Sequence, residues 1–164
     1  MNHPYAARPE AAKHEWLTPP EIIRALGTFS LDPCSPIGRP WDTALSHYTE
    51  EVDGLTCDWN GRVWLNPPYG KHTSAWLKKM ASHGNGIALV FARTETRMFF
   101  HYVWPSAYAV LFMAGRPSFY HVNGKQAKGN SGGPMVLIAY SDADAEALRV
   151  SSIAGKYIRL KEQP

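Results

Sequence analysis

The tetrapeptide Asn66-Pro67-Pro68-Tyr69 carries the residue types with the clearest chemical use in this chain. Asn66 offers a side-chain carbonyl, and Pro67 offers a main-chain carbonyl held by two adjacent fixed φ angles. Two such acceptors can bind both hydrogens of an exocyclic amine and free its lone pair for attack on an activated methyl group. Tyr69 adds a flat face for a stacked base. A strand-ending turn with a surface tyrosine explains the same four residues.

The apolar run from Val63 to Leu65 precedes this motif and predicts the end of a buried strand. The two prolines stop the strand because neither can donate a ladder hydrogen bond. The motif is therefore expected on a rigid loop at the carboxyl end of a strand, where open α/β sheets bind their ligands.

Length and charge limit the class of protein. The 164 residues fit one domain with a sizeable core. No run is long and apolar enough to span a bilayer, and the first residues do not resemble a signal peptide, so we expect a cytoplasmic protein. Cys34 and Cys57 lack metal-ligand spacing. The net charge is only +3, yet the stretch from Arg97 to Ser141 has no acidic residue, which suits a polyanionic partner or a solvated face.

Helical and strand-like patterns alternate, which predicts an α/β domain over residues 15–164 after a flexible tail over residues 1–14. Thr18-Pro19-Pro20-Glu21 has the form of a capping box, with Thr18 as the cap of a helix that Gly27 ends. Thr73 or Ser74 is expected to cap a second helix. The expected strands cover residues 29–31, 44–49, 62–65, 87–91, 108–113 and 135–140, and further helices cover residues 98–103 and 142–150.

The strands over residues 108–113 and 135–140 have no helix between them, so we expect an antiparallel pair. Residues 157–160 are expected as a short strand or a tail. Asp32 follows an early strand, where its carboxylate could face a cofactor's ammonium or ribose, although an Asx-type turn before proline explains it equally. Glu50 and Glu51 follow the next expected strand, where nucleotide-binding folds often place an acid for the ribose.

Asn-Pro-Pro-Tyr resembles the catalytic motif of amino methyltransferases that use S-adenosylmethionine. The wider run, with Asp53-Gly54-Leu55, Trp59, Gly61 and residues 63–70, is similar to the small phage-type DNA adenine methyltransferases, the Dam-like family. Residues 16–20, 31–35 and 92–94 extend the resemblance, which covers most of the chain from Trp16 to about Tyr140.

The resemblance implies a single Rossmann-like class I methyltransferase domain with a mixed, mostly parallel sheet and an antiparallel final strand pair. It implies site-specific methylation of adenine in single- or double-stranded DNA, in the cytoplasm of a host cell if the gene is phage-derived. No metal is implied, because the sulfonium already activates the methyl group. The expected catalytic residues are Asn66, Pro67, Pro68 and Tyr69, and the expected cofactor-binding residues are Thr18, Pro19, Asp32, Pro33, Cys34, Ser35 and Asp53.

Asp53 is preferred over Glu50 for the adenosine half of the cofactor, because Asp53-Gly54 matches the family; a turn carboxylate is the alternative. Positive charge near the motif and in the acid-free stretch predicts contacts with nucleic acid. The expected nucleic-acid-binding residues are Lys71, His72, Arg93, Arg97, Arg116, Lys125 and Lys128.

Other functions compete with DNA methylation. Methyltransferases that modify glutamine amides in proteins have a similar motif. RNA is a second alternative substrate. A non-catalytic nucleic-acid-binding module would carry the same positive charges. Residues 129–134 resemble the nucleophile segment of trypsin-like serine proteases, but that chemistry needs a placed His and Asp on two β-barrels.

Overall fold

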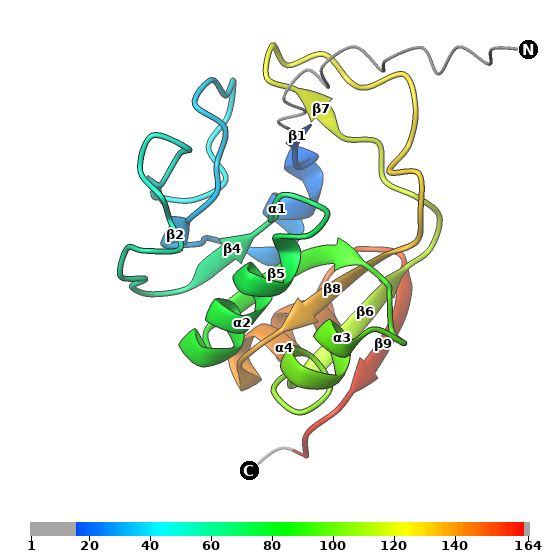
Figure 1. Cartoon of the computed structure of the whole chain (residues 1–164). Coiled ribbons are helices and arrows are strands. Elements are labelled where there is room, and N and C mark those ends of the chain that lie inside the picture. The colour runs from blue at the N-terminus through cyan, green and yellow to red at the C-terminus, as the bar shows by residue number, and fades with distance from the viewer. Residues whose placement is uncertain (1–15, 163–164) are drawn as a thin grey trace, which may run out of the picture.

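The computed structural model describes residues 16–162, and within them a seven-stranded sheet is covered by helices and joined by a small two-stranded sheet (Figure 1). The tail expected over residues 1–14 lies outside the described residues. The helices are α1 (Pro20–Leu26), α2 (Thr73–His83), α3 (Arg97–Tyr102) and α4 (Asp142–Val150). The strands are β1 (Trp16–Leu17), β2 (Leu31–Asp32), β3 (Ser46–His47), β4 (Val63–Leu65), β5 (Gly86–Phe91), β6 (Ala109–Met113), β7 (Tyr120–His121), β8 (Met135–Ala139) and β9 (Gly155–Arg159).

The strands of the large sheet lie in the order β3-β2-β4-β5-β8-β6-β9. The pairs from β3 to β5 are parallel, whereas β8 is antiparallel to both β5 and β6, and β9 is antiparallel to β6. The mixed sheet and the antiparallel late strands are confirmed. Three of the strand pairs are parallel and three are antiparallel, because β9 adds a further antiparallel pair beside β6. The sheet is therefore mixed but not mostly parallel.

Side chains on the two faces of the sheet form two separate apolar clusters. On one face, Leu65 and Val90 pack with residues of α2 and α3, including Leu77 and Phe99. On the other face, Trp64 and its neighbours pack with residues of α1 and α4. Strands buried on both faces need continuous apolar sequence, which explains why β4 and β5 could be predicted as strands.

Two predicted helix caps are wrong. Helix α1 begins at Pro20, and Pro19 at its N-cap makes no side-chain capping hydrogen bond. Thr18 is buried, and its hydroxyl accepts a hydrogen bond from the Asn66 side chain instead. His72, rather than Thr73 or Ser74, precedes the first turn of α2.

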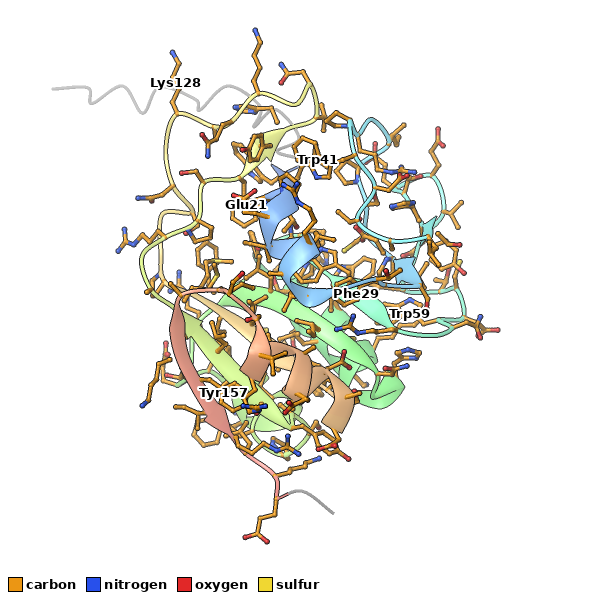
Figure 2. The ribbon with its side chains drawn as sticks, turned by 180° about the vertical axis from the view of Figure 1, so that it is seen from behind. Glu21, Phe29, Trp41, Trp59, Lys128 and Tyr157 are labelled. Carbon is orange, nitrogen blue, oxygen red and sulfur yellow. The ribbon has the colours of Figure 1, made fainter. Side chains whose placement is uncertain are left out.

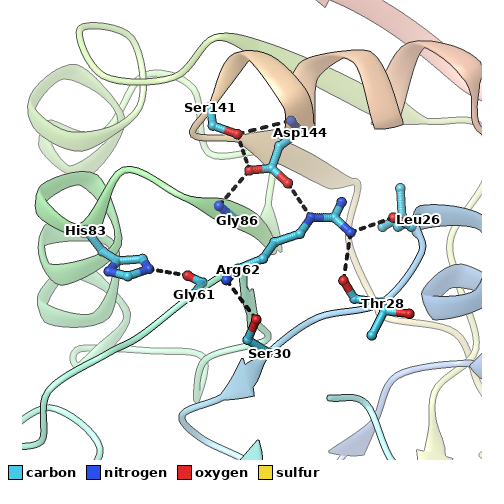
Figure 3. Close-up of polar contacts among 9 residues, drawn as sticks. All are labelled: Leu26, Thr28, Ser30, Gly61, Arg62, His83, Gly86, Ser141 and Asp144. Carbon is cyan, nitrogen blue, oxygen red and sulfur yellow. Dashed lines mark hydrogen bonds and ion pairs between the residues drawn. The ribbon is translucent and has the colours of Figure 1, made fainter. Parts of the chain in front are cut away.

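The buried carboxylate of Asp144 and its partner Arg62 connect four segments at the amino ends of β4 and β5 (Figure 3). Its Oδ1 accepts a hydrogen bond from Arg62 Nε at 2.6 Å, and its Oδ2 accepts hydrogen bonds from Gly86 N at 2.6 Å and Ser141 Oγ at 2.5 Å. Arg62 Nη1 donates to the carbonyls of Leu26 at 2.8 Å and Thr28 at 3.1 Å. The pair therefore connects the end of α1, the starts of β4 and β5, and the start of α4.

Arg62→Met should lower the free energy of unfolding by about 3–5 kcal/mol, because it leaves the Asp144 carboxylate buried without its cation. Urea denaturation of both proteins measures the difference. Arg149→Met is the matched control, since Arg149 pairs with Glu146 on the exposed side of α4 and surface pairs contribute little. Equal, small losses in the two variants would contradict a structural role for the buried pair.

Candidate active site

Three loops meet at the carboxyl ends of β2, β3 and β4 and enclose a cavity of about 470 Å³. These strands are parallel neighbours, so their carboxyl ends lie at one edge of the sheet. Trp16 of β1 and Trp76 of α2 complete the lining. The loops contribute residues 33–36, then Thr49, Glu50, Asp53 and Gly54, and then residues 66–69.

Most of the predicted cofactor-binding residues lie at this cavity. Pro33, Cys34, Ser35 and Asp53 line it together with the whole Asn-Pro-Pro-Tyr motif. Thr18, Pro19 and Asp32 contribute no lining atom: Thr18 contacts the site through Asn66, and Pro19 lines a different cavity beside α1.

Sequence reasoning missed several lining residues. Trp76 lies on the apolar face of α2. The helical spacing of apolar residues does not distinguish a core residue from one that lines a cavity. Trp16 reaches the cavity because β1 pairs with β7, and its partner in that register is His121. Glu50 was considered from the sequence as a ribose-binding acid but Asp53 was preferred, and both residues line the cavity.

The Asn66 side chain is held at both ends. Its Nδ2 donates to Thr18 Oγ1 at 3.3 Å, and its Oδ1 accepts a hydrogen bond from the Tyr69 hydroxyl at 2.5 Å. The main-chain carbonyl of Asn66 accepts a hydrogen bond from Cys34 Sγ at 3.1 Å. These contacts fix the orientation of the amide and connect the motif loop to the loop after β2.

Tyr69 is more enclosed than the surface tyrosine considered from sequence. Its ring centroid lies 4.8 Å from that of Phe91 and 6.5 Å from that of Phe119. Burial raises the pKa of Tyr69 well above its usual value, so the hydroxyl is a neutral hydrogen-bond donor. Tyr69 also lines a second cavity of about 510 Å³, to which Arg93 and Thr96 contribute.

The first residue of α2 stabilises the motif loop. Thr73 Oγ1 donates to the Pro68 carbonyl at 2.8 Å and accepts a hydrogen bond from Gly70 N at 3.0 Å. The two prolines therefore restrict the backbone of the loop, and the buried Thr73 hydroxyl fixes the orientation of the loop. A preorganised loop of this kind can present two carbonyl acceptors at fixed positions.

Asp32 does not line the cavity, but its two hydrogen bonds order the loop after β2. Its Oδ1 accepts a hydrogen bond from Cys34 N at 3.1 Å, and its Oδ2 accepts one from Thr43 Oγ1 at 2.5 Å. Desolvation raises the pKa of Asp32 to about 6, although both hydrogen bonds and the charge of Arg39 act in the opposite direction. The contact with Cys34 N is the Asx-type turn considered as the alternative for this residue.

The predicted nucleic-acid-binding residues lie at the surface around the motif and on the β6–β8 connection. Lys71, His72 and Arg93 are exposed and adjoin the motif loop or the second cavity. Lys128 projects away from the body of the protein (Figure 2). Arg97, Arg116 and Lys125 are also exposed, and they lie at the start of α3, after β6 and after β7, respectively.

The protease-like segment has a different role in this fold. Ser131 Oγ donates to the Gly133 carbonyl at 2.8 Å, which orders the loop, whereas a protease serine donates to a histidine. Within residues 16–162, no group of three or more His, Cys, Asp or Glu residues could hold a metal ion. None of the helices described there is long and apolar enough to cross a membrane.

A family model of DNA N-6-adenine-methyltransferases (Dam) matches residues 6–156. The chain belongs to this family. The resemblance drawn from the sequence is thereby confirmed, and membership of the Dam family indicates an enzyme that modifies adenine in DNA. Neither a curated protein nor a solved structure matches the chain.

Asp32→Asn should change the pH dependence of stability. The folded-state pKa of about 6 lies above the ordinary 3.8, so the folded protein binds this proton more tightly than the unfolded chain. Asp32 therefore contributes most at low pH, and that contribution falls by about 3 kcal/mol as the pH rises through about 6. The variant should accordingly gain about that much relative to the parent protein between pH 4 and pH 8.

Urea denaturation across this pH range measures the effect. Thr43→Val removes a hydrogen bond that lowers the pKa of Asp32, so that pKa should rise further. The free energy of unfolding should therefore fall by more with rising pH than it does in the parent protein. A stability difference between Asp32→Asn and the parent that does not vary with pH would show that this carboxyl is not desolvated.

Proposed function

We propose that this Dam-family enzyme transfers a methyl group from S-adenosylmethionine to the exocyclic amine of adenine in DNA. The observation that carries the proposal is the position of the Asn-Pro-Pro-Tyr motif in the wall of the 470 Å³ cavity. A methyl donor bound in that cavity would lie next to an amine held by the motif. We also infer a Rossmann-like class I fold, which the parallel strands β3, β2, β4 and β5 and the antiparallel β8 support.

The lining of the cavity fits S-adenosylmethionine. Its volume lies in the range of small-molecule sites. Trp16, Trp76 and Pro33 offer apolar surface for a purine, and the carboxylates of Glu50 and Asp53 are the acceptors that ribose hydroxyls require. When bound, the cofactor supplies a methyl group that its sulfonium charge has already activated.

The motif residues would hold and orient the target amine. Asn66 Oδ1 and the Pro67 carbonyl accept its two hydrogens, which withdraws its lone pair from the aromatic ring. The nitrogen could then accept the methyl group that the cofactor would supply, with the sulfonium leaving as a neutral thioether, and the two acceptors would stabilise the cationic amine. The nitrogen then releases one proton to water, so no general base is needed before attack.

The Tyr69 hydroxyl lies 2.5 Å from the oxygen that this mechanism assigns to the amine. An amide oxygen has two lone pairs, so Asn66 Oδ1 can accept a hydrogen bond from the incoming amine beside the one from Tyr69. The Tyr69 ring also lines the cavity and is the proposed surface on which adenine stacks. An adenine within duplex DNA must also leave the base stack to reach the motif, at a cost of about a few kcal/mol.

Asn66→Ala should lower the single-turnover rate on adenine-containing DNA by a factor of hundreds, or about 3 kcal/mol, because the lost acceptor acts most strongly on the cationic transition state. Binding of S-adenosylmethionine in calorimetry should persist. Asn66→Asp keeps an acceptor oxygen and should retain measurable activity. Asn60→Ala, at an exposed position, is the control and should match the parent rate.

Rates for Asn66→Ala and Asn66→Asp that both equal the parent rate would rule out Asn66 as the acceptor. RNA and a glutamine-containing peptide serve as alternative substrates in the same assay. Methyl transfer to either one, with none to DNA, would replace the proposed substrate while leaving the motif's role intact.

Lys125 and Lys128 should contribute to DNA affinity through phosphate contacts, because both are exposed on the β6–β8 connection. Replacing both by Ala should flatten the plot of log affinity against log salt by about one to two units. Fluorescence anisotropy with a labelled duplex measures the slope. Lys78→Ala with Lys156→Ala removes two exposed charges elsewhere and should leave the slope unchanged; equal effects would mean a nonspecific charge effect.

A further inference from the structure

The ammonium group of Lys79, in the middle of α2, binds three main-chain carbonyls of one loop. Its Nζ donates to the carbonyls of Gly54 at 3.2 Å and Leu55 at 2.8 Å, and also to that of Cys57. Carbonyl dipoles that converge on one point repel one another unless a cation lies between them. The hydrogen bonds are charge-assisted, which makes them roughly twice as strong as neutral ones.

Trp59 holds the same loop from a second side. Its Nε1 donates to the Gly54 carbonyl at 2.8 Å, and Lys79 Nζ lies 5.1 Å from the centroid of its ring. The Trp59 ring stacks on Trp76, with centroids 6.2 Å apart, and Trp76 lines the cavity. The loop, the cation and the cavity wall therefore form one packed unit.

The loop held by Lys79 contributes directly to the proposed cofactor cavity. Asp53 and Gly54 line it, and the Asp53 carbonyl and carboxylate accept hydrogen bonds from the next turn of the loop. Gly54 packs tightly on the loop after β2, since a Cβ atom at Gly54 would lie 2.1 Å from the Pro33 carbonyl oxygen. A shift of the loop would move Asp53 and would also disturb the contact with Pro33.

We infer that Lys79 is a positioning residue for S-adenosylmethionine: it fixes residues 53–57 so that Asp53 and Gly54 form the adenosine side of the cavity. The inference rests on the proposed function. Lys79 acts on a different loop from Thr73, which stabilises the motif at the first turn of the same helix. Loss of Lys79 should therefore weaken cofactor binding without slowing methyl transfer once the cofactor is bound.

The test compares Lys79→Met with Lys78→Met, a neighbouring exposed lysine on α2. Calorimetry should show a Kd for S-adenosylmethionine raised about tenfold to a hundredfold in Lys79→Met and unchanged in Lys78→Met. At saturating cofactor, kcat and the KM for DNA should stay within about twofold of the parent values. Lys79→Arg keeps the charge and several donors, so its Kd should lie between those of the parent and Lys79→Met.

Thermal melting verifies that each variant is folded, and Lys79→Gln replaces Lys79→Met if the latter does not fold. A folded, neutral variant with the parent's Kd would overturn the inference, as would a fall in kcat as large as the loss of affinity. Lys79→Arg binding no better than the neutral variant would also overturn it. Failure of the parent protein itself to bind S-adenosylmethionine would instead refute the proposed function.

Discussion

The buried ion pair between Arg62 and Asp144 is the interaction on which the geometry of the site depends. It fixes the amino ends of β4 and β5 against α1 and α4. Strands fixed at one end deliver their carboxyl ends at defined positions, and β4 leads directly into Asn66. The ion pair thus fixes the strands at their amino ends, and the loops at the carboxyl ends of β2, β3 and β4 form the cavity.

Polar groups near the cavity are used mainly to hold loops in place. Asp32 and Thr43 order the loop after β2, Thr73 orders the motif loop, and Lys79 orders the loop over residues 53–57. These contacts are buried or partly buried, and each pairs polar groups of two segments or of one loop. The groups proposed to meet the ligands are then left with few ways to move, which is the condition for electrostatic catalysis.

Local sequence patterns predicted the strand before the motif, the buried β5 and the α4 helix, because apolar periodicity and proline placement determine them. Contacts between distant residues could not be predicted in this way. Thr18 has the local form of a helix cap, but its hydroxyl contacts Asn66, 48 positions away. The pairing of β1 with β7 and the enclosure of Tyr69 by Phe91 and Phe119 likewise depend on tertiary packing.

Mass spectrometry of nucleosides tests the central claim most directly. The protein is incubated with methyl-labelled S-adenosylmethionine and unmethylated duplex DNA, with Asn66→Ala in parallel, and the DNA is digested completely. We predict labelled N6-methyl-deoxyadenosine from the parent protein and at least a hundredfold less from the variant. Label on cytosine, or no label in DNA at enzyme concentrations that saturate the substrate, would contradict adenine methylation by this motif.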